Sequence, residues 1–95
     1  EADIIFLLIS ADFINSDYCY SNEMEFAINR HNNREAIVIP IILRHCLWHE
    51  TPFGKLLALP KDGKPIKSKD WYSIDEALTD VASGIKRLIE EHFYP

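Results

Sequence analysis

Glu23 is the residue whose surroundings in the sequence best suit chemistry, and it lies at the centre of the stretch Ser16–Ile28. An apolar run, Ile4–Ile9, ends before this stretch, and a second apolar run, Ile37–Leu43, follows it. The order strand, loop, acidic helix, strand places a carboxylate near the end of a buried sheet. The plainer alternative is a solvated helix acid, which is the usual environment of a glutamate.

Three other groups of side chains are of types that occur in reactive sites. His45, Cys46 and His49 are potential metal ligands, but no second Cys or His pair lies at zinc spacing, so the sequence does not favour a metal site. Ser16 has no histidine near it in sequence to activate it, and we interpret it as a helix cap. Cys19 is interpreted first as a small packed hydrophobic residue.

Two strands and one helix must position Glu23. Residues 3–10 contain six consecutive apolar residues, a pattern typical of a strand buried on both faces. Ser16 predicts the start of a helix that runs to about Asn32. A periodicity of 3.6 residues places Glu23 half sheltered on the shoulder of this helix and Glu25 in solvent. The core-facing stripe of the helix comprises Tyr20, Met24, Ala27, Ile28 and His31.

A second buried strand is predicted over residues 36–43, which are rich in β-branched side chains. Pro40 lies inside this strand and cannot donate a hydrogen bond to the sheet. The strand therefore either meets a neighbour on one side only at Pro40 or contains a bulge there. In the irregular segment that follows, we expect a short helix over 52–57 and a short edge strand within 66–71.

The last predicted element is an amphipathic helix. Ser73 and Glu76 have the spacing of a capping box, and the helix continues to about His92. Its apolar face comprises Ala77, Leu78, Val81, Ile85, Leu88 and Ile89. Strand, helix, strand, loop and helix together predict an α/β layered fold with right-handed crossovers.

Composition narrows the class of protein. A chain of 95 residues with a net charge of -5 is one small domain, and its ten scattered Lys and Arg residues argue against nucleic acid as a partner. No apolar run is long enough to cross a membrane, and two separated cysteines favour a reducing, cytoplasmic compartment. The chain opens with Glu1 and enters a strand at once, which predicts a piece of a longer protein, with a processed terminus as the alternative.

Five stretches, in order along the chain, resemble the bacterial form of the Toll/interleukin-1 receptor (TIR) domain. They are ADIIFLLIS, SDYCYSNEMEFAINRH, AIVIPIILRHCLW, PFGKLLALPKDGKPI and DWYSIDEALTDVASGI. The resemblance implies a flavodoxin-like fold, a five-stranded parallel sheet with helices on both faces. It also implies that residues 1–95 form a partial TIR domain, which begins at the third strand and lacks the first two strands and helices of the family.

The resemblance also implies an activity. Many members of the family cleave NAD at the bond between nicotinamide and ribose with one glutamate on the helix after the third strand, and here that glutamate is Glu23. Nicotinamide leaves as a neutral group while the ribose gains oxocarbenium character, so a nearby carboxylate stabilises the developing charge. The carboxylate can also orient a ribose hydroxyl or the attacking water. NAD is the substrate, and neither a metal nor a cofactor is expected.

The same resemblance suggests residues that contact the substrate, namely Ser16, Tyr18, Cys19 and Trp48. The family pattern often has Trp-Cys, two residues and then the glutamate, whereas here three residues separate Tyr18-Cys19 from Glu23. This offset leaves either Tyr18 or Tyr20 as the aromatic residue of the pocket. For Trp48 the alternative is a packing role over its own loop.

The resemblance therefore leaves two alternative functions. The first is an NAD glycohydrolase or cyclase in bacterial immune or antiphage signalling, fused to an effector or sensor domain and acting with other TIR domains by self-association. The second is a non-catalytic TIR module that signals by self-association alone. A phospho-receiver domain is disfavoured, because the strands end in Ser10 and Arg44 rather than in an acidic acceptor. The 95 residues alone are expected to be inactive, because the first strand would expose an apolar edge.

Overall fold

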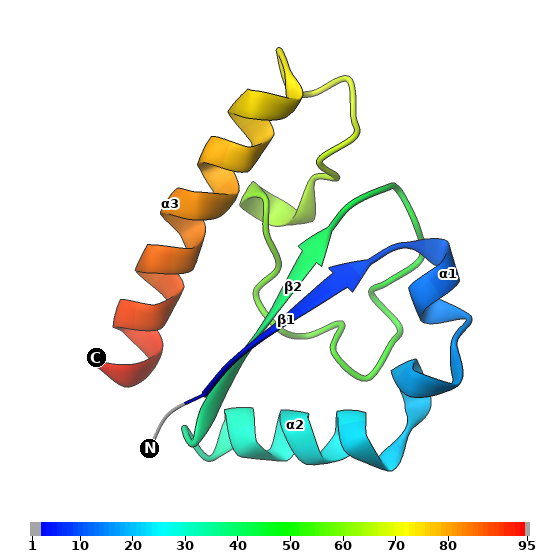
Figure 1. The fold of residues 1–95 in the computed structure, drawn as a ribbon, viewed down its shortest axis with the longest axis vertical. Helices are drawn as coiled ribbons and strands as arrows, with labels where there is room; N and C mark the ends of the chain where they lie inside the picture. Colours follow the sequence, from blue (N-terminus) through cyan, green and yellow to red (C-terminus); the bar gives the residue numbers. More distant parts are fainter. Residues whose placement is uncertain (1–2, 95) are drawn as a thin grey trace.

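A computed structural model describes residues 3–94, and Figure 1 shows its path. The chain begins with the strand β1 (Asp3–Ile9), a short helix α1 (Ala11–Ile14) and a 3-10 turn, η1 (Asp17–Tyr20). Helix α2 (Asn22–Asn32) and strand β2 (Ala36–Ile42) follow. A long irregular segment that contains the 3-10 turn η2 (Lys61–Gly63) then leads to helix α3 (Ile74–Phe93).

The two strands form a parallel sheet, with Asp3 opposite Ala36 and Ile9 opposite Ile42. Parallel strands joined through a helix are the expected α/β arrangement, so this coarse prediction is confirmed. Alternate residues of β2 point to opposite faces. Val38 and Ile42 pack with residues of α2, whereas Ile37, Ile39 and Ile41 pack with residues of α3. Helices α2 and α3 therefore cover opposite faces of the sheet.

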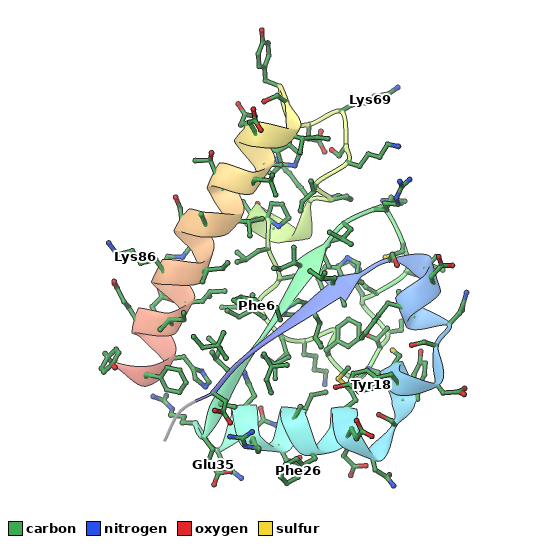
Figure 2. The ribbon with its side chains drawn as sticks, viewed as in Figure 1. Phe6, Tyr18, Phe26, Glu35, Lys69 and Lys86 are labelled. Carbon is green, nitrogen blue, oxygen red and sulfur yellow. The ribbon has the colours of Figure 1, made fainter. Side chains whose placement is uncertain are left out.

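Strand β2 is buried along its whole length, as the sequence predicts, but β1 is buried on one face only. Helix α3 covers one face of the sheet over β2 but not over β1. On that face, Ile4, Phe6 and Leu8 of β1 are 46, 46 and 55% exposed. Figure 2 shows Phe6 on the side of β1 that faces α3. Within residues 3–94, β1 pairs with β2 alone, so its other edge is also unpaired. The expectation that β1 is buried on both faces is wrong for the described residues.

The outer edge of β2, away from β1, is closed by the irregular segment and by side chains. The Pro40 carbonyl accepts from the Leu59 N–H at 2.9 Å, and the Ile42 N–H donates to the Leu59 carbonyl at 2.8 Å. Because a residue in a strand directs its nitrogen and its carbonyl to the same side, the missing donor of Pro40 faces this outer edge. The ladder with β1 continues past Pro40 without a bulge, so the proline costs the sheet no hydrogen bond.

Helix α3 begins where the sequence places it. The Ser73 hydroxyl accepts from the Glu76 N–H at 3.2 Å, while the Glu76 carboxylate accepts from the N–H of Tyr72 rather than from that of Ser73. Its apolar face packs as predicted except at Leu78, which is exposed.

The irregular segment differs from two predictions. Residues 52–57 contain turns and no helix, and residues 66–71 form no strand. Residues 66 and 67 are nevertheless hydrogen-bonded to the end of β2. The Ile66 N–H donates to the Ile42 carbonyl at 2.9 Å, and the Lys67 N–H donates to the Leu43 carbonyl at 3.1 Å. None of the helices described between Asp3 and Tyr94 combines the length and apolar character that crossing a bilayer requires.

Candidate functional site

Glu23 lies in the first turn of α2, and this helix is capped by Ser21, five residues later than the sequence predicted. Ser21 is its N-cap: the Ser21 hydroxyl accepts from the Met24 N–H at 3.2 Å and donates to the Tyr18 carbonyl at 2.7 Å. A negative charge in this turn is favourable, because the free N–H groups of a helix start carry partial positive charge. The side chain of Glu23 is exposed, as is that of Glu25, so the expected half-sheltered environment of Glu23 is wrong.

Glu23 lines an open hollow of about 430 Å³ between β1 and α2. This volume falls within the range of roughly 300–1,000 Å³ that small-molecule sites occupy. The other lining residues are Ile5, Tyr18, Asn22, Phe26, Ala27 and Arg30. Figure 2 shows Tyr18 near the start of α2 and Phe26 further along the same helix. The hollow thus joins one carboxylate, one guanidinium and two aromatic rings on a partly apolar floor.

Of the two charged side chains in the hollow, Arg30 forms an ion pair and Glu23 forms none within residues 3–94. The guanidinium of Arg30 pairs with the Asp3 carboxylate at 2.7 Å and lies 6.0 Å from the centroid of the Phe26 ring. Glu23 forms no ion pair with any of residues 3–94. A carboxylate without a cationic partner at the rim of a hollow can stabilise a positive charge that develops in a bound molecule.

The structure decides between the two candidate aromatic residues. Tyr18 lines the hollow with Glu23, and its ring packs edge-to-face on Phe13 with centroids 6.1 Å apart. Tyr20 lines a separate hollow with Glu25 and Pro52. Tyr18 is therefore the tyrosine that accompanies Glu23. Tyr20 is also exposed and does not belong to the core-facing stripe in which the sequence placed it.

Ser16 makes a local hydrogen bond in this arrangement, and Cys19 packs in the core. The Ser16 hydroxyl donates to the Phe13 carbonyl at 2.5 Å and makes no side-chain cap hydrogen bond to the turn that follows it. The prediction that Ser16 caps the glutamate-bearing helix is wrong, because Ser21 has that role. Cys19 is fully buried in the core between the sheet and α2, and burial raises the pKa of its thiol. Neither residue lines the hollow of Glu23.

Trp48 is a core residue rather than a wall of the hollow. Its side chain is 7% exposed and packs in the same core cluster as Met24 and Phe53. The indole stacks on the His49 ring with centroids 3.9 Å apart. A Cβ atom added to Gly63 would lie 2.5 Å from Cζ2 of Trp48, so the glycine makes room for the indole. The structure does not bring Trp48 together with Glu23 and Tyr18.

Sequence reasoning missed five residues of the hollow, among them Phe26 and Arg30. A usable signal was present for these two, because they follow Glu23 by three and seven positions and so share its side of the helix. Among residues 3–94, no group of three or more His, Cys, Asp or Glu side chains is arranged to hold a metal ion, and this includes His45, Cys46 and His49.

Comparison with known proteins gives one relative. The chain is 62% identical over 84 residues to a protein of Sinorhizobium fredii (strain NBRC 101917 / NGR234) described as "Uncharacterized protein y4lF". The match covers 88% of this chain and 25% of that protein, so the chain spans about a quarter of the length of the curated relative it matches. No family model and no solved structure matches the chain.

Proposed function

We propose that this chain is part of a TIR domain that cleaves NAD at the nicotinamide–ribose bond, with Glu23 as the catalytic carboxylate. The observation that carries the proposal is the hollow in which Glu23, free of any ion pair within residues 3–94, lies beside Tyr18 and Phe26. In the proposed reaction nicotinamide departs as a neutral base. The ribose then carries the positive charge that Glu23 faces.

The other residues of the hollow have roles that suit such a substrate. Tyr18 offers an exposed aromatic face on which a pyridine or ribose ring can stack. Arg30 supplies a guanidinium suited to a phosphate, although its pairing with Asp3 must open first. The open shape of the hollow fits a site that further residues of the full-length protein complete.

A flavodoxin-like fold belongs to the same proposal. A parallel pair of strands with helices on both faces is what the centre of a doubly wound sheet looks like. Further strands and a helix have a place to pack against β1, because its outer edge is unpaired within residues 3–94 and its Ile4, Phe6 and Leu8 side chains are exposed. We propose that the longer protein supplies them and that it works in the cytoplasm, within bacterial immune or antiphage signalling.

The test is the release of nicotinamide from NAD by the full-length protein and its variants. Glu23→Ala is expected to lower turnover by at least about 100-fold, the usual size of such a charge contribution. Glu25→Ala is the matched control, because Glu25 is an exposed acid in the same helical turn. It should keep turnover within about twofold, since a solvated charge outside the hollow contributes little. Equal turnover by the wild type and Glu23→Ala would end the proposal.

A second candidate function is a non-catalytic module that assembles with other domains of its kind. The exposed face of β1 favours it, since a large uncovered apolar strand commonly marks an interface. It predicts no loss of NAD and a concentration-dependent assembly that Phe6→Lys abolishes. Leu47→Lys, which changes an exposed leucine remote from β1 in sequence, is the control. Assembly that survives Phe6→Lys unchanged argues against this face as the interface.

A further inference from the structure

Two histidines close the outer edge of β2 at its beginning, where no other strand of residues 3–94 lies beside it. His31 of α2 accepts a hydrogen bond from the Val38 N–H through Nδ1, at 2.9 Å. His92 of α3 lies with its Nε2 atom 2.9 Å from the Ala36 carbonyl oxygen. The two imidazole rings pack on each other with centroids 4.4 Å apart. Two side chains thus take the place of a neighbouring strand over residues 36–38.

The two contacts require opposite proton positions. A backbone N–H can only donate, so Nδ1 of His31 carries no proton and the neutral ring holds its proton on Nε2. A carbonyl can only accept, so Nε2 of His92 carries a proton. A second proton on His92 would enter at Nδ1 and leave its bond to Ala36 intact. A second proton on His31 would enter at the atom that holds Val38, and two donors would then face each other.

This corner also joins the ends of two helices. Arg34, in the turn after α2, donates to the His92 carbonyl at 3.3 Å. Figure 1 shows the C-terminal ends of α2 and α3 near the start of β2. We propose that His31 and His92 form a proton-sensitive latch that seals the edge of β2 at Ala36–Val38 and holds these helix ends together, and that acidification releases it.

The surroundings of His31 favour the closed latch at neutral pH. The cavity around the pair is lined by the ionisable groups Arg34, Glu91 and His92, while β2 and Leu57 contribute only apolar side chains. Burial lowers the pKa of His31, and the nearby His92 lowers it further. The positive charge of Arg34 opposes protonation of His31, whereas the exposed carboxylate of Glu91 would favour it.

The sign of the pH effect follows from linkage. A histidine whose folded pKa lies below its unfolded value of about 6.5 stabilises the closed state fully above that value. This contribution falls as the pH drops below about 6.5 towards the lower folded pKa. Between pH 7.5 and 5.5, the equilibrium for opening the latch should therefore rise by about tenfold at most.

The test is hydrogen exchange of the 36–42 segment in the full-length protein, expressed as protection factors so that the intrinsic pH dependence of exchange is removed. The wild type should lose protection at the Val38 amide between pH 7.5 and 5.5, by more than about twofold and by about tenfold at most. His31→Asn retains an acceptor near the position of Nδ1 but cannot titrate, so it should change by less than about twofold. His45→Asn, which alters an exposed histidine, is the control and should behave as the wild type does.

An equal loss of protection in the wild type and in His31→Asn would overturn the latch. Should His31→Asn fail to fold, ring ¹⁵N shifts of the wild type decide instead. A neutral His31 ring with its proton on Nε2, titrating below the unfolded value of about 6.5, supports the proposal. A ring with its proton on Nδ1 contradicts it, because that tautomer cannot accept from Val38.

Discussion

Replacing Trp48 by alanine tests whether this indole belongs to the core or to a substrate site. The side chain is 7% exposed and packs with Met24, Phe53 and the ring of His49. Its removal would leave a cavity that the surrounding turns cannot fill, because Gly63 has no side chain to move into it. We expect Trp48→Ala to lower the free energy of unfolding by about 3–5 kcal/mol.

A companion variant, Gly63→Ala, perturbs the same contact without altering the indole. The added methyl group would lie 2.5 Å from Cζ2 of Trp48, and the backbone there has φ of 73°, which favours glycine. Left-handed strain and overpacking together should cost about 2–4 kcal/mol. Asp62→Ala is the control, because Asp62 has φ of 59° but an exposed side chain, and its cost should stay below about 1 kcal/mol.

The assay is urea unfolding of the full-length protein, followed by far-UV circular dichroism. With a slope of about 2 kcal/mol per molar urea, Trp48→Ala should lower the midpoint by about 1.5–2.5 M. The KM for NAD, measured below the transition, should be unchanged, because Trp48 does not line the hollow of Glu23. An unchanged midpoint together with a raised KM would show that the indole contacts the substrate and would refute the core packing.

Two further predictions follow from the start of α2 and from the cysteines. Ser21→Ala should lower the free energy of unfolding by about 1 kcal/mol and speed hydrogen exchange at the Met24 amide. Ser16→Ala should leave that amide protected. Faster exchange in Ser16→Ala than in Ser21→Ala would show that Ser16 is the cap. At pH 7, iodoacetamide should modify Cys46 before the fully buried Cys19, and both more slowly than a free thiol, because burial raises the pKa of each. Mass spectrometry that finds Cys19 alkylated first would contradict this core.

The parts of the fold that the sequence predicts well are those governed by local patterns. Helix α3 begins at Ser73 because its cap and its long apolar stripe agree with each other. Strand β2 is rich in β-branched residues and is buried on both faces. The sequence could not decide whether Pro40 lies at an edge or in a bulge. The answer depends on which side of the strand its nitrogen faces, and that side is the one bonded to the distant residue Leu59.

The start of α2 was misplaced because two serines compete for the same role. Ser16 and Ser21 are both good caps, and the intervening turn is tightened into a 3-10 form that buries Cys19 and exposes Tyr20. A helical period of 3.6 cannot describe that turn, since a 3-10 helix has about three residues per turn. The period therefore put Tyr20 on the core side, where the structure does not place it.

The candidate site was predictable in part, because Glu23, Tyr18, Phe26 and Arg30 are close in sequence. Contacts between residues distant in the sequence could not be predicted. Trp48 could be assigned to the core only once Gly63 was seen against its ring. The contact of His92 with Ala36 joins residues 56 positions apart, and no local pattern marks it.

The central claim is that NAD binds with its scissile bond beside Glu23, and a crystal structure of the full-length Glu23→Gln variant with NAD tests it most directly. The amide keeps the shape of the side chain but cannot stabilise the ribosyl cation, so intact NAD should persist. We predict nicotinamide and its ribose in the hollow between β1 and α2, with residue 23 in contact with the ribose and Tyr18 against a ring. NAD bound elsewhere, with this hollow empty, would contradict the account.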